Sequence, residues 1–499
     1  MRNAFKSILL AVVTMIAGTV AYAQVTTASL GGRIVDAKGE TIIGAAVVAT
    51  HTPSGTTYGA VTNLEGRYQI NGMRAGGPYR IEVSNLGYQS VIFNDVTLQL
   101  GEQTVLDAYM EDASEALTES VVVADASRFR RERNGAATNI SSSQITSLPT
   151  ITRSMNDIMA LTPQASTSTN GIAVGGGNYR GSSVTVDGAA FNNAFGIGQN
   201  LPAGGSPISL DAIEQISVNI TPFDVRQSGF TGGAINAVTK SGSNQFHASV
   251  YDYYTSDKFN GYKVSGEDVP HSLSLNHTIG ATIGGPIIKN KLFFFVNGEY
   301  SFDTSAGSTR VARENASQEY GGSSSTNRPT VAQMDEMSKY VQDHFNYNPG
   351  RYQKYDLETP DYKLMARLDW NINDDNRLNV RFSHTHNYYS SSPSTSMSPV
   401  GGNDSSFKGP NGEDVSFNRN SAGRQSIYAL FYEAARYYQE QNFTSVAAEL
   451  NSRIGKGNNI FRATYSHQFE PRSFVAMRSL RWTSCPMTAS LSVMTSMVS

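Results

Sequence analysis

The sequence has a single cysteine, Cys485, so no disulfide framework can form within the chain. Charged residues make up only 16% of the 499 residues and the net charge is -3, a balance that does not indicate a nucleic-acid partner. Beyond the N-terminus, the sequence has no apolar run of the roughly 20 residues that a membrane-spanning helix needs. Any membrane crossing by the mature protein is therefore predicted to use strands.

The first residues have the pattern of an export signal. Arg2 and Lys6 form a short positive region, and residues 8–20 are mostly apolar. Ala21-Tyr22-Ala23 is a small-residue cleavage site that leaves Gln24 as the mature start. The pattern predicts a signal peptide over residues 1–23; the alternative, a membrane anchor, needs a longer apolar run.

Residues 24–112 are predicted to form a small β-sandwich. The turn signals Asp36-Ala37-Lys38-Gly39 and Asn63-Leu64-Glu65-Gly66 separate short β-prone runs. The pieces G-x-I-x-D-x-x-G, I-x-G-A-x-V and E-G-x-Y-x-I make this region resemble the carboxypeptidase regulatory-like domain, which implies an immunoglobulin-like fold. The positions expected on the inner faces are Ile34, Val47, Tyr68, Ile70, Ile81 and Val83.

A polar, acidic stretch, residues 111–120, runs directly into Val121-Val122-Val123-Ala124. A mobile segment that ends in a β-prone run can pair with a partner as an added strand, which requires free backbone groups more than particular side chains. The alternative is a linker followed by the first strand of the next domain. The local pattern leaves both interpretations open.

Residues 125–242 are predicted to mix short helices and strands. Residues 151–163 favour a short helix with Thr152 as its N-cap, and Asp187-Gly188 marks a turn after a strand. Ser209 is a second candidate cap, before a strand. The region resembles the plug domain of TonB-dependent outer-membrane receptors, and the Oar-like subfamily in particular. The matching pieces are Leu148-Pro149-Thr150, Arg153-Ser154, Asp157-Ile158, Leu161-Thr162-Pro163, Arg180-Gly181, Val186-Asp187-Gly188, Ile213-Glu214, and Gly232-Gly233-Ala234-Ile235-Asn236 through Thr239-Lys240.

The resemblance implies roles for two sets of residues. The segment over residues 113–124 stands where these receptors carry a TonB box, which a periplasmic TonB-type energy-coupling protein pairs with as a strand; the box candidates are Leu117, Thr118, Glu119, Ser120, Val121, Val122 and Val123. Charges that lock the plug are expected at Arg153, Arg180, Asp187, Glu214 and Arg226, for which ordinary solvated polarity is the alternative.

From residue 243 to residue 472, apolar and polar residues alternate in long strands joined by tight turns and long polar loops. In KLFFFVNGEY, residues 291–300, Leu292, Phe294 and Val296 are expected to face lipid. Phe293 and Phe295 are expected to pack on the plug or near the periplasmic rim, and Asn297 and Glu299 to face a wet, plug-filled lumen. Strands of about 10 residues fit a tilted membrane crossing, and alternating tight turns and long loops are typical of outer-membrane barrels.

Several other features have more ordinary interpretations. His384 and His386 near Asp374-Asp375 are better explained as a polar strand end than as a metal site. Residues 331–345 predict a short helix in a surface loop, with Met334, Met337 and either Tyr340 or Val341 on its packing face. The sequence shows no nucleophile–base pair and no phosphate loop, so it predicts no enzyme, no cofactor and no metal.

The alternation stops in residues 473–499, where Ser, Thr and Met dominate. Only about eight barrel strands can be counted, whereas plugged transporters have about 22. We therefore expect a truncated receptor with a frameshifted tail. The predicted fold class is mainly β: an N-terminal immunoglobulin-like sandwich, an α+β plug and an incomplete antiparallel transmembrane β-barrel. The predicted function is energised passage of an unidentified polar ligand across the outer membrane, in contact with outer-membrane lipid; the alternatives are an adhesion or export-conduit protein, or a soluble secreted β-protein.

Overall fold

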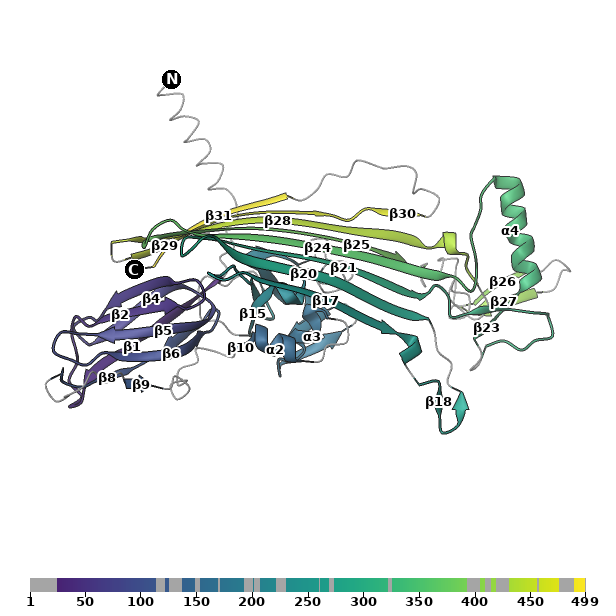
Figure 1. The fold of residues 1–499 in the computed structure, drawn as a ribbon. Helices are drawn as coiled ribbons and strands as arrows, with labels where there is room; N and C mark the ends of the chain where they lie inside the picture. The colour runs from purple at the N-terminus through teal and green to yellow at the C-terminus, as the bar shows by residue number, and fades with distance from the viewer. Residues whose placement is uncertain are drawn as a thin grey trace, which may run out of the picture.

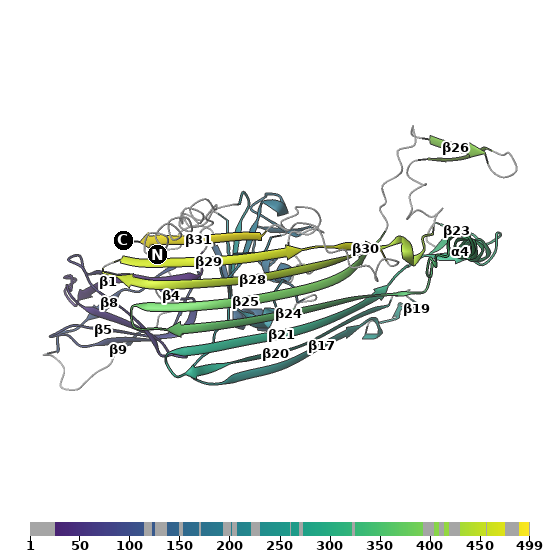
Figure 2. The same cartoon turned by 90° about the horizontal axis from the view of Figure 1, so that it is seen from above.

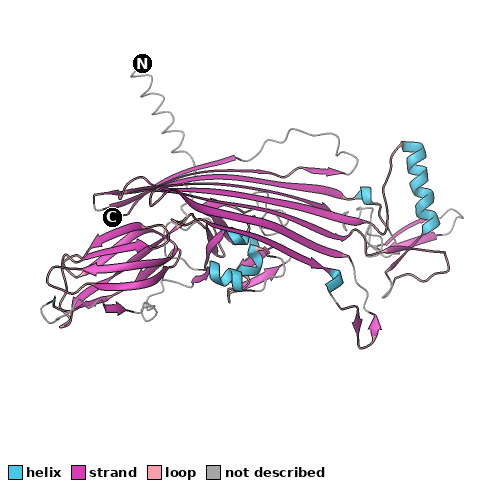
Figure 3. Cartoon of the chain, in the orientation of Figure 1, coloured by secondary structure: helices cyan, strands magenta, loops and turns pink. Residues whose placement is uncertain are grey.

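The computed structural model describes residues 25–113, 122–124, 137–148, 153–168, 171–192, 201, 207–220, 230–259, 261–268, 273–321, 325–392, 404–408, 414–418, 430–455, 457–474 and 489–498. Figure 1 shows a sandwich of strands at one end, a small mixed unit in the middle and one long, curved sheet. Figure 3 shows that strands dominate the described residues, in which α4 (Val331–Phe345) is the longest helix. No described helix is long and apolar enough to cross a membrane. The predicted signal peptide lies outside the described residues.

The N-terminal unit is a sandwich of two sheets. One sheet has the order β4-β1-β7, with β8 beside β1, and the other has the order β3-β2-β5-β6-β9. Its strands are β1 (Thr27–Asp36), β2 (Ala46–His51), β3 (Thr56–Val61), β4 (Arg67–Arg74), β5 (Gly76–Ser84), β6 (Val91–Leu98), β7 (Gln103–Val105), β8 (Ala108–Met110) and β9 (Val122–Ala124). In the first turn, the Asp36 carboxylate accepts from the backbone N–H groups of Lys38 and Glu40, at 2.9 and 2.8 Å, which satisfies two donors that the sheet leaves unpaired.

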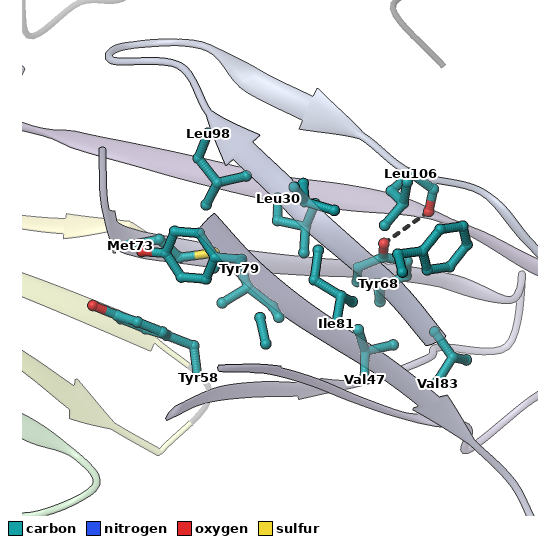
Figure 4. Packing of buried hydrophobic residues seen from close by; sticks show 14 of the residues in the cluster. Leu30, Val47, Tyr58, Tyr68, Met73, Tyr79, Ile81, Val83, Leu98 and Leu106 are labelled. Carbon is teal, nitrogen blue, oxygen red and sulfur yellow. Dashed lines mark hydrogen bonds between the residues drawn. The ribbon is translucent and has the colours of Figure 1, made fainter. Parts of the chain in front are cut away.

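The six positions predicted to face the interior of the sandwich are all at most 5% exposed, which confirms that prediction. Figure 4 shows Leu30, Ile81 and Leu98 packed between the sheets, with Tyr79 beside Met73. Tyr68 donates its hydroxyl hydrogen to the Leu106 carbonyl oxygen at 2.7 Å, so the polar end of this buried ring has a partner.

The middle unit, called the plug below, is built on a sheet of order β10-β15-β16-β13-β14. Its elements are β10 (Ala137–Ser141), α2 (Ser142–Ser147), α3 (Met155–Met159), β11 (Ala165–Ser168), β12 (Gly171–Val174), η3 (Tyr179–Gly181), β13 (Ser183–Val186), β14 (Ala189–Ala190), η5 (Leu210–Ala212), β15 (Ile213–Asn219) and β16 (Ala234–Thr239). The predicted turn at Asp187-Gly188 and the predicted cap at Ser209, which accepts from the Asp211 N–H, are confirmed. The helix cap predicted at Thr152 is wrong: Ser154 caps α3, because the helix begins only at Met155.

The long sheet has nine antiparallel strands, eight in the order β17-β20-β21-β24-β25-β28-β29-β31, with β30 beside β28. They are β17 (His247–Ser256), β20 (Ser274–Ile288), β21 (Leu292–Ala306), β24 (Asp356–Asn371), β25 (Asn376–Ser391), β28 (Tyr437–Ile454), β29 (Gly457–Phe469), β30 (Arg472–Phe474) and β31 (Ala489–Val498). Among the described strands the sheet does not close, since β17 and β31 each pair on one side only. Figure 2 shows the longer strands side by side, whereas β30 and β31 cover only part of the length of the sheet.

The two faces of the long sheet differ as predicted for residues 291–300. Phe293 and Phe295 are 0% and 6% exposed, and Asn297 and Glu299 lie on the same inner face. On the outer face of β24, exposed apolar side chains run from Trp370 to Tyr362. Eight residue steps at about 3.4 Å each give about 27 Å along the strand, close to the ~25 Å apolar band of outer-membrane barrels. Most of the strands are longer than the predicted 10 residues because they continue past this band.

Tight turns and long loops lie at opposite ends of the long sheet. The short turns after β20, β24 and β28 lie beside the sandwich, whereas α4 and the small strands lie at the far end (Figure 1). The small elements are η6 (Asp257–Phe259), β18 (Lys263–Val264), β19 (Glu267–Asp268), β22 (Val311–Arg313), β23 (Thr326–Thr330), β26 (Asp404–Lys408), β27 (Asp414–Asn418) and η7 (Glu433–Ala435).

Helix α4 forms as predicted, but part of its predicted packing face is wrong. Met334 is buried, whereas Met337 and Tyr340 are 53% and 51% exposed. Among the described elements, the helix makes its main contacts with the short strands β22 and β23, which offer little surface for a longer apolar stripe. Tyr340 instead stacks on His344, with ring centroids 4.0 Å apart.

Candidate functional site

The inner face of the long sheet holds the plug through a group of buried charges, named here the Asp187 cluster: Asp187, Thr239, Arg367, Asp369 and Arg381. Asp187 lies in the turn between β13 and β14 with φ of +50°, a conformation that Asp tolerates. Its carboxylate accepts from the Thr239 N–H at 3.0 Å and from the Thr239 hydroxyl at 2.7 Å, both within the plug. These two bonds link the turn to β16 within the plug, independently of the sheet.

Two arginines of the sheet reach this turn. Arg367 and Arg381 place guanidinium nitrogens 3.8 and 3.7 Å from Asp187 Oδ1. Arg381 also donates to the Asp187 carbonyl oxygen, and Arg367 donates to the Thr239 carbonyl oxygen at 2.7 Å. Arg367 and Arg381 face each other across β24 and β25. One acidic group of the plug therefore lies between two cations of the long sheet, which is called the wall below.

Gly188, next in the turn, lies against a further arginine of the long sheet, Arg462. It has φ of +81°, and a Cβ atom there would lie 2.9 Å from a guanidinium nitrogen of Arg462. The positive φ favours glycine at this position, and a larger residue would also force the Arg462 side chain to shift.

A second group, the Glu299 cluster, lies further toward the long loops. Glu299 of β21 accepts from the Ser209 hydroxyl of the plug at 2.7 Å and from the Tyr251 hydroxyl of β17 at 3.0 Å. Lys363 of β24 lies 2.8 Å from Glu299 and 3.1 Å from Asp361. All of these groups are buried or partly buried, so each charge depends on its partners rather than on water.

The sandwich completes the charge network at the short-turn end. Arg74, at the end of β4, lies 3.3 Å from Asp369 of the sheet and donates to the Ser241 hydroxyl of the plug at 2.6 Å. Thr26 donates to Glu449 and accepts from Arg462, each at 2.6 Å. Three parts of the chain that are far apart in sequence thus share one buried polar junction.

Comparisons with known proteins agree with this architecture. Residues 29–111 match the carboxypeptidase regulatory-like domain, and residues 238–452 match an outer membrane beta barrel domain. The TonB-dependent transporter Oar of Myxococcus xanthus is 27% identical over 249 residues, which cover 47% of this chain and 21% of that protein. The chain is related to the TonB-dependent outer-membrane receptors.

A second relative is the TonB-dependent receptor SusC of Bacteroides thetaiotaomicron, 25% identical over 305 residues, with 55% of this chain and 28% of that protein covered. The crystal structure of the siderophore receptor PirA from Acinetobacter baumannii matches 67% of this chain and 40% of its own, with 14% identity and a TM-score of 0.41. The chain therefore spans about a quarter of the length of Oar and of SusC. In outer-membrane barrels the short turns face the periplasm, and in this chain the short turns lie beside the sandwich (Figure 1).

The structure places the predicted plug-locking residues in different surroundings. Asp187 contacts the sheet directly. Arg153 pairs with Asp211 inside the plug, and its guanidinium carbon lies 3.7 Å from the centroid of the Tyr253 ring of β17. Arg180 is exposed and bonds its neighbour Tyr179. Arg226 and the box residues 117–121 lie outside the described residues.

The sequence predicted Glu299 on the inner face but did not identify the other charged residues of that face. Arg367 and Arg381 contact the plug at Asp187, Asp369 and Glu449 contact the sandwich, and Lys363 and Arg462 pair with Glu299 and Glu449. The signal that could have found them is an ionisable residue at an inward position of a membrane strand, where an unpaired charge is costly and a partner is expected. Their alternation with apolar residues is visible in the sequence, but the plug groups opposite them are not.

The two histidines lie on the outer face of β25. His386 stacks on Tyr362 with ring centroids 4.8 Å apart, and His384 bonds Thr444 at 2.9 Å. Within the described ranges, no group of three His, Cys, Asp or Glu residues is arranged to hold a metal ion.

Glu214 of β15 lies between the plug and the sandwich, where a methyl group at Gly76 would be 2.8 Å from its Oε1. Burial raises the pKa of Glu214, an effect that Lys240, Arg367 and Arg74 partly offset. Glu214 therefore stabilises the docking of the plug on the sandwich fully at pH values below its unfolded pKa. This stabilisation is lost as pH rises through the raised pKa. We expect Glu214→Gln to raise, at pH 7, the urea concentration at which half of the plugs have detached from the wall. The change of this midpoint between pH 5 and pH 7 should be smaller in the variant than in the unmodified chain. An unchanged pH profile would show that Glu214 is solvated.

Proposed function

We propose that the chain is the N-terminal part of a TonB-dependent transporter that passes a polar ligand across the outer membrane by energised rearrangement of its plug. The observation that carries the proposal is the set of polar contacts between plug and wall, which accompanies apolar packing of Phe295, Met365 and Phe443 on the plug. Asp187 and Ser209 of the plug both bond charged wall residues. Water that enters the lumen can replace such contacts, so a plug seated in this way can be displaced and can return.

In the proposed cycle, a ligand binds on the side of the long loops, near the Glu299 cluster. The box at residues 117–123 then pairs with a periplasmic TonB-type coupling protein, and pulling on it breaks the Asp187 cluster. Asp187 is proposed as the main lock of the plug, and Arg153, Glu214 and Arg226 are proposed to adjust its seat. Arg180, which is exposed and bonds its neighbour Tyr179, is proposed to contribute little. The relatives are transporters and receptors, and we propose the same class of function here rather than an enzyme.

Deletion of residues 117–123 tests the box directly. We expect the deletion to abolish binding of the purified periplasmic domain of a TonB-type protein to the detergent-solubilised chain, measured by biolayer interferometry. The reason is that strand addition needs the backbone of that segment.

The matched control replaces Val121, Val122 and Val123 with alanine, which keeps the backbone. This variant should bind within about threefold of the unmodified chain, because main-chain hydrogen bonds supply most of the affinity. If the deletion variant still binds, the box is elsewhere and the assignment of residues 117–123 is wrong.

A further inference from the structure

One edge of the sandwich already carries an added strand from the region of the predicted box. Strand β9 pairs in parallel with β6, with the register Val91↔Val122, Ile92↔Val123 and Phe93↔Ala124. Without β9, β6 would be the edge of its sheet, since the order is β3-β2-β5-β6-β9. Residues 122 and 123 are also the last two residues of the candidate box.

The chain follows the same edge as it leaves the sandwich. Tyr88 and Asp112 form an antiparallel bridge, the Gln89 N–H donates to the Glu111 carbonyl oxygen at 2.8 Å, and the Ala113 N–H donates to the Gly87 carbonyl oxygen at 2.9 Å. Residues 87–93 thus pair with the chain at two places, first with residues 111–113 and then with residues 122–124. Two independent contacts on one edge indicate that this edge is a docking strip for main chain.

The local shape of β6 limits how far this ladder extends. Asp95 has φ of +56°, and the pairing of β6 with β5 shifts register twice. A bend of this kind ends regular pairing beyond Phe93. The β6–β9 ladder is therefore short, and it orders the segment as a strand without a long interface.

Strand β9 has a second edge, and that edge is unpaired among the strands that the structure describes. An exposed strand edge with free backbone N–H and C=O groups is a template for a further strand. A segment that is already extended also loses less conformational freedom when a partner binds.

We propose that the sandwich is a docking platform for the coupling protein: β6 holds Val122–Ala124 as a strand, and a strand of the periplasmic coupling protein adds to the outer edge of β9, continuing the sheet of the sandwich. This inference rests on the proposed function, because it takes the segment to be the coupling box. It adds that the box is recognised together with the sandwich rather than as a free peptide.

A disulfide between the paired positions 91 and 122 tests the platform. The variant V91C/V122C is made in a C485S background, so that the engineered pair holds the only thiols. The probe is the purified periplasmic domain of a TonB-type coupling protein. We expect the oxidised and reduced forms to bind it within about threefold of each other, because β9 stays on β6 in the complex.

A tenfold or greater loss of binding on oxidation overturns the proposal, since the segment would then have to leave β6 before the partner binds. If neither form binds while the protein is folded, the box assignment itself fails, and with it the proposed function. The single variant V122C in the same background controls for the effect of the substitution alone.

Amide hydrogen exchange of the unmodified chain gives a second test that needs no variant. On adding the coupling domain, we expect amides of Val122–Ala124 to exchange at least tenfold more slowly, while those of residues 91–93 keep their protection. Loss of protection at residues 91–93 contradicts the platform. A dimer of the chain that forms without the coupling domain and slows exchange at Val122–Ala124 also contradicts it, because a second copy would then occupy the outer edge of β9.

Discussion

Replacing Asp187 with asparagine should loosen the plug from the wall by about 3–5 kcal/mol, the usual cost of removing one partner from a buried ion pair. Asparagine keeps the size of the side chain and tolerates the positive φ of this turn. The substitution therefore removes mainly the charge that lies between Arg367 and Arg381. With a urea dependence of about 2 kcal/mol per molar, the midpoint of plug release should fall by about 2 M.

The midpoint can be followed by amide exchange of β16, which contains the Thr239 partner of Asp187. The matched control is Arg180→Gln, which also removes one charge from the plug but at an exposed site. This control should change the free energy of plug release by less than about 0.5 kcal/mol. Equal effects of the two substitutions would show that the arginine pair does not hold the plug.

His51 should make the sandwich sensitive to acid. It is buried at the end of β2, its ring nitrogen Nδ1 lies 2.7 Å from the Ser54 hydroxyl, and its ring packs on Tyr79. Burial is the main cause that lowers the pKa of His51 to about 3; the nearby Arg74 lowers it further, and Asp369 opposes the shift.

Since the pKa is depressed in the folded state, the stability that neutral His51 contributes is present above the unfolded pKa of 6.5 and is lost as pH falls toward 3. Two pH units below 6.5, the loss is about 2.7 kcal/mol. Urea unfolding followed by circular dichroism at pH 7.0 and pH 4.5 should show this decrease for the unmodified chain.

The variant His51→Gln keeps a polar group for Ser54 but does not titrate. Its loss of stability between the two pH values should be smaller by about 2–3 kcal/mol, and the difference between the two proteins removes the contribution of the carboxylates. Parallel pH profiles for the two proteins would place the histidine in contact with water.

The sequence alone was sufficient for the local architecture. Apolar alternation predicts the inward positions of the sandwich and the two faces of β21, since a strand places successive side chains on opposite faces whatever lies beyond it. The Asp187-Gly188 turn and the Ser209 cap follow from the backbone preferences of those residues. The limits of such local rules appear at α3 and α4, where the true cap is Ser154 and where Met337 finds little surface to pack on.

The tertiary structure alone decided the site. Asp187 bonds Thr239 of the plug, 52 positions away, and Arg381 of the long sheet, 194 positions away. Arg74 and Thr26 belong to the sandwich, yet they bond Asp369 and Glu449 of the wall, which lie hundreds of residues later in the sequence. Periodicity shows which side of a strand carries a charge, but the partner of that charge depends on how separate domains dock, because an ion pair depends on distance in space and not on distance along the chain.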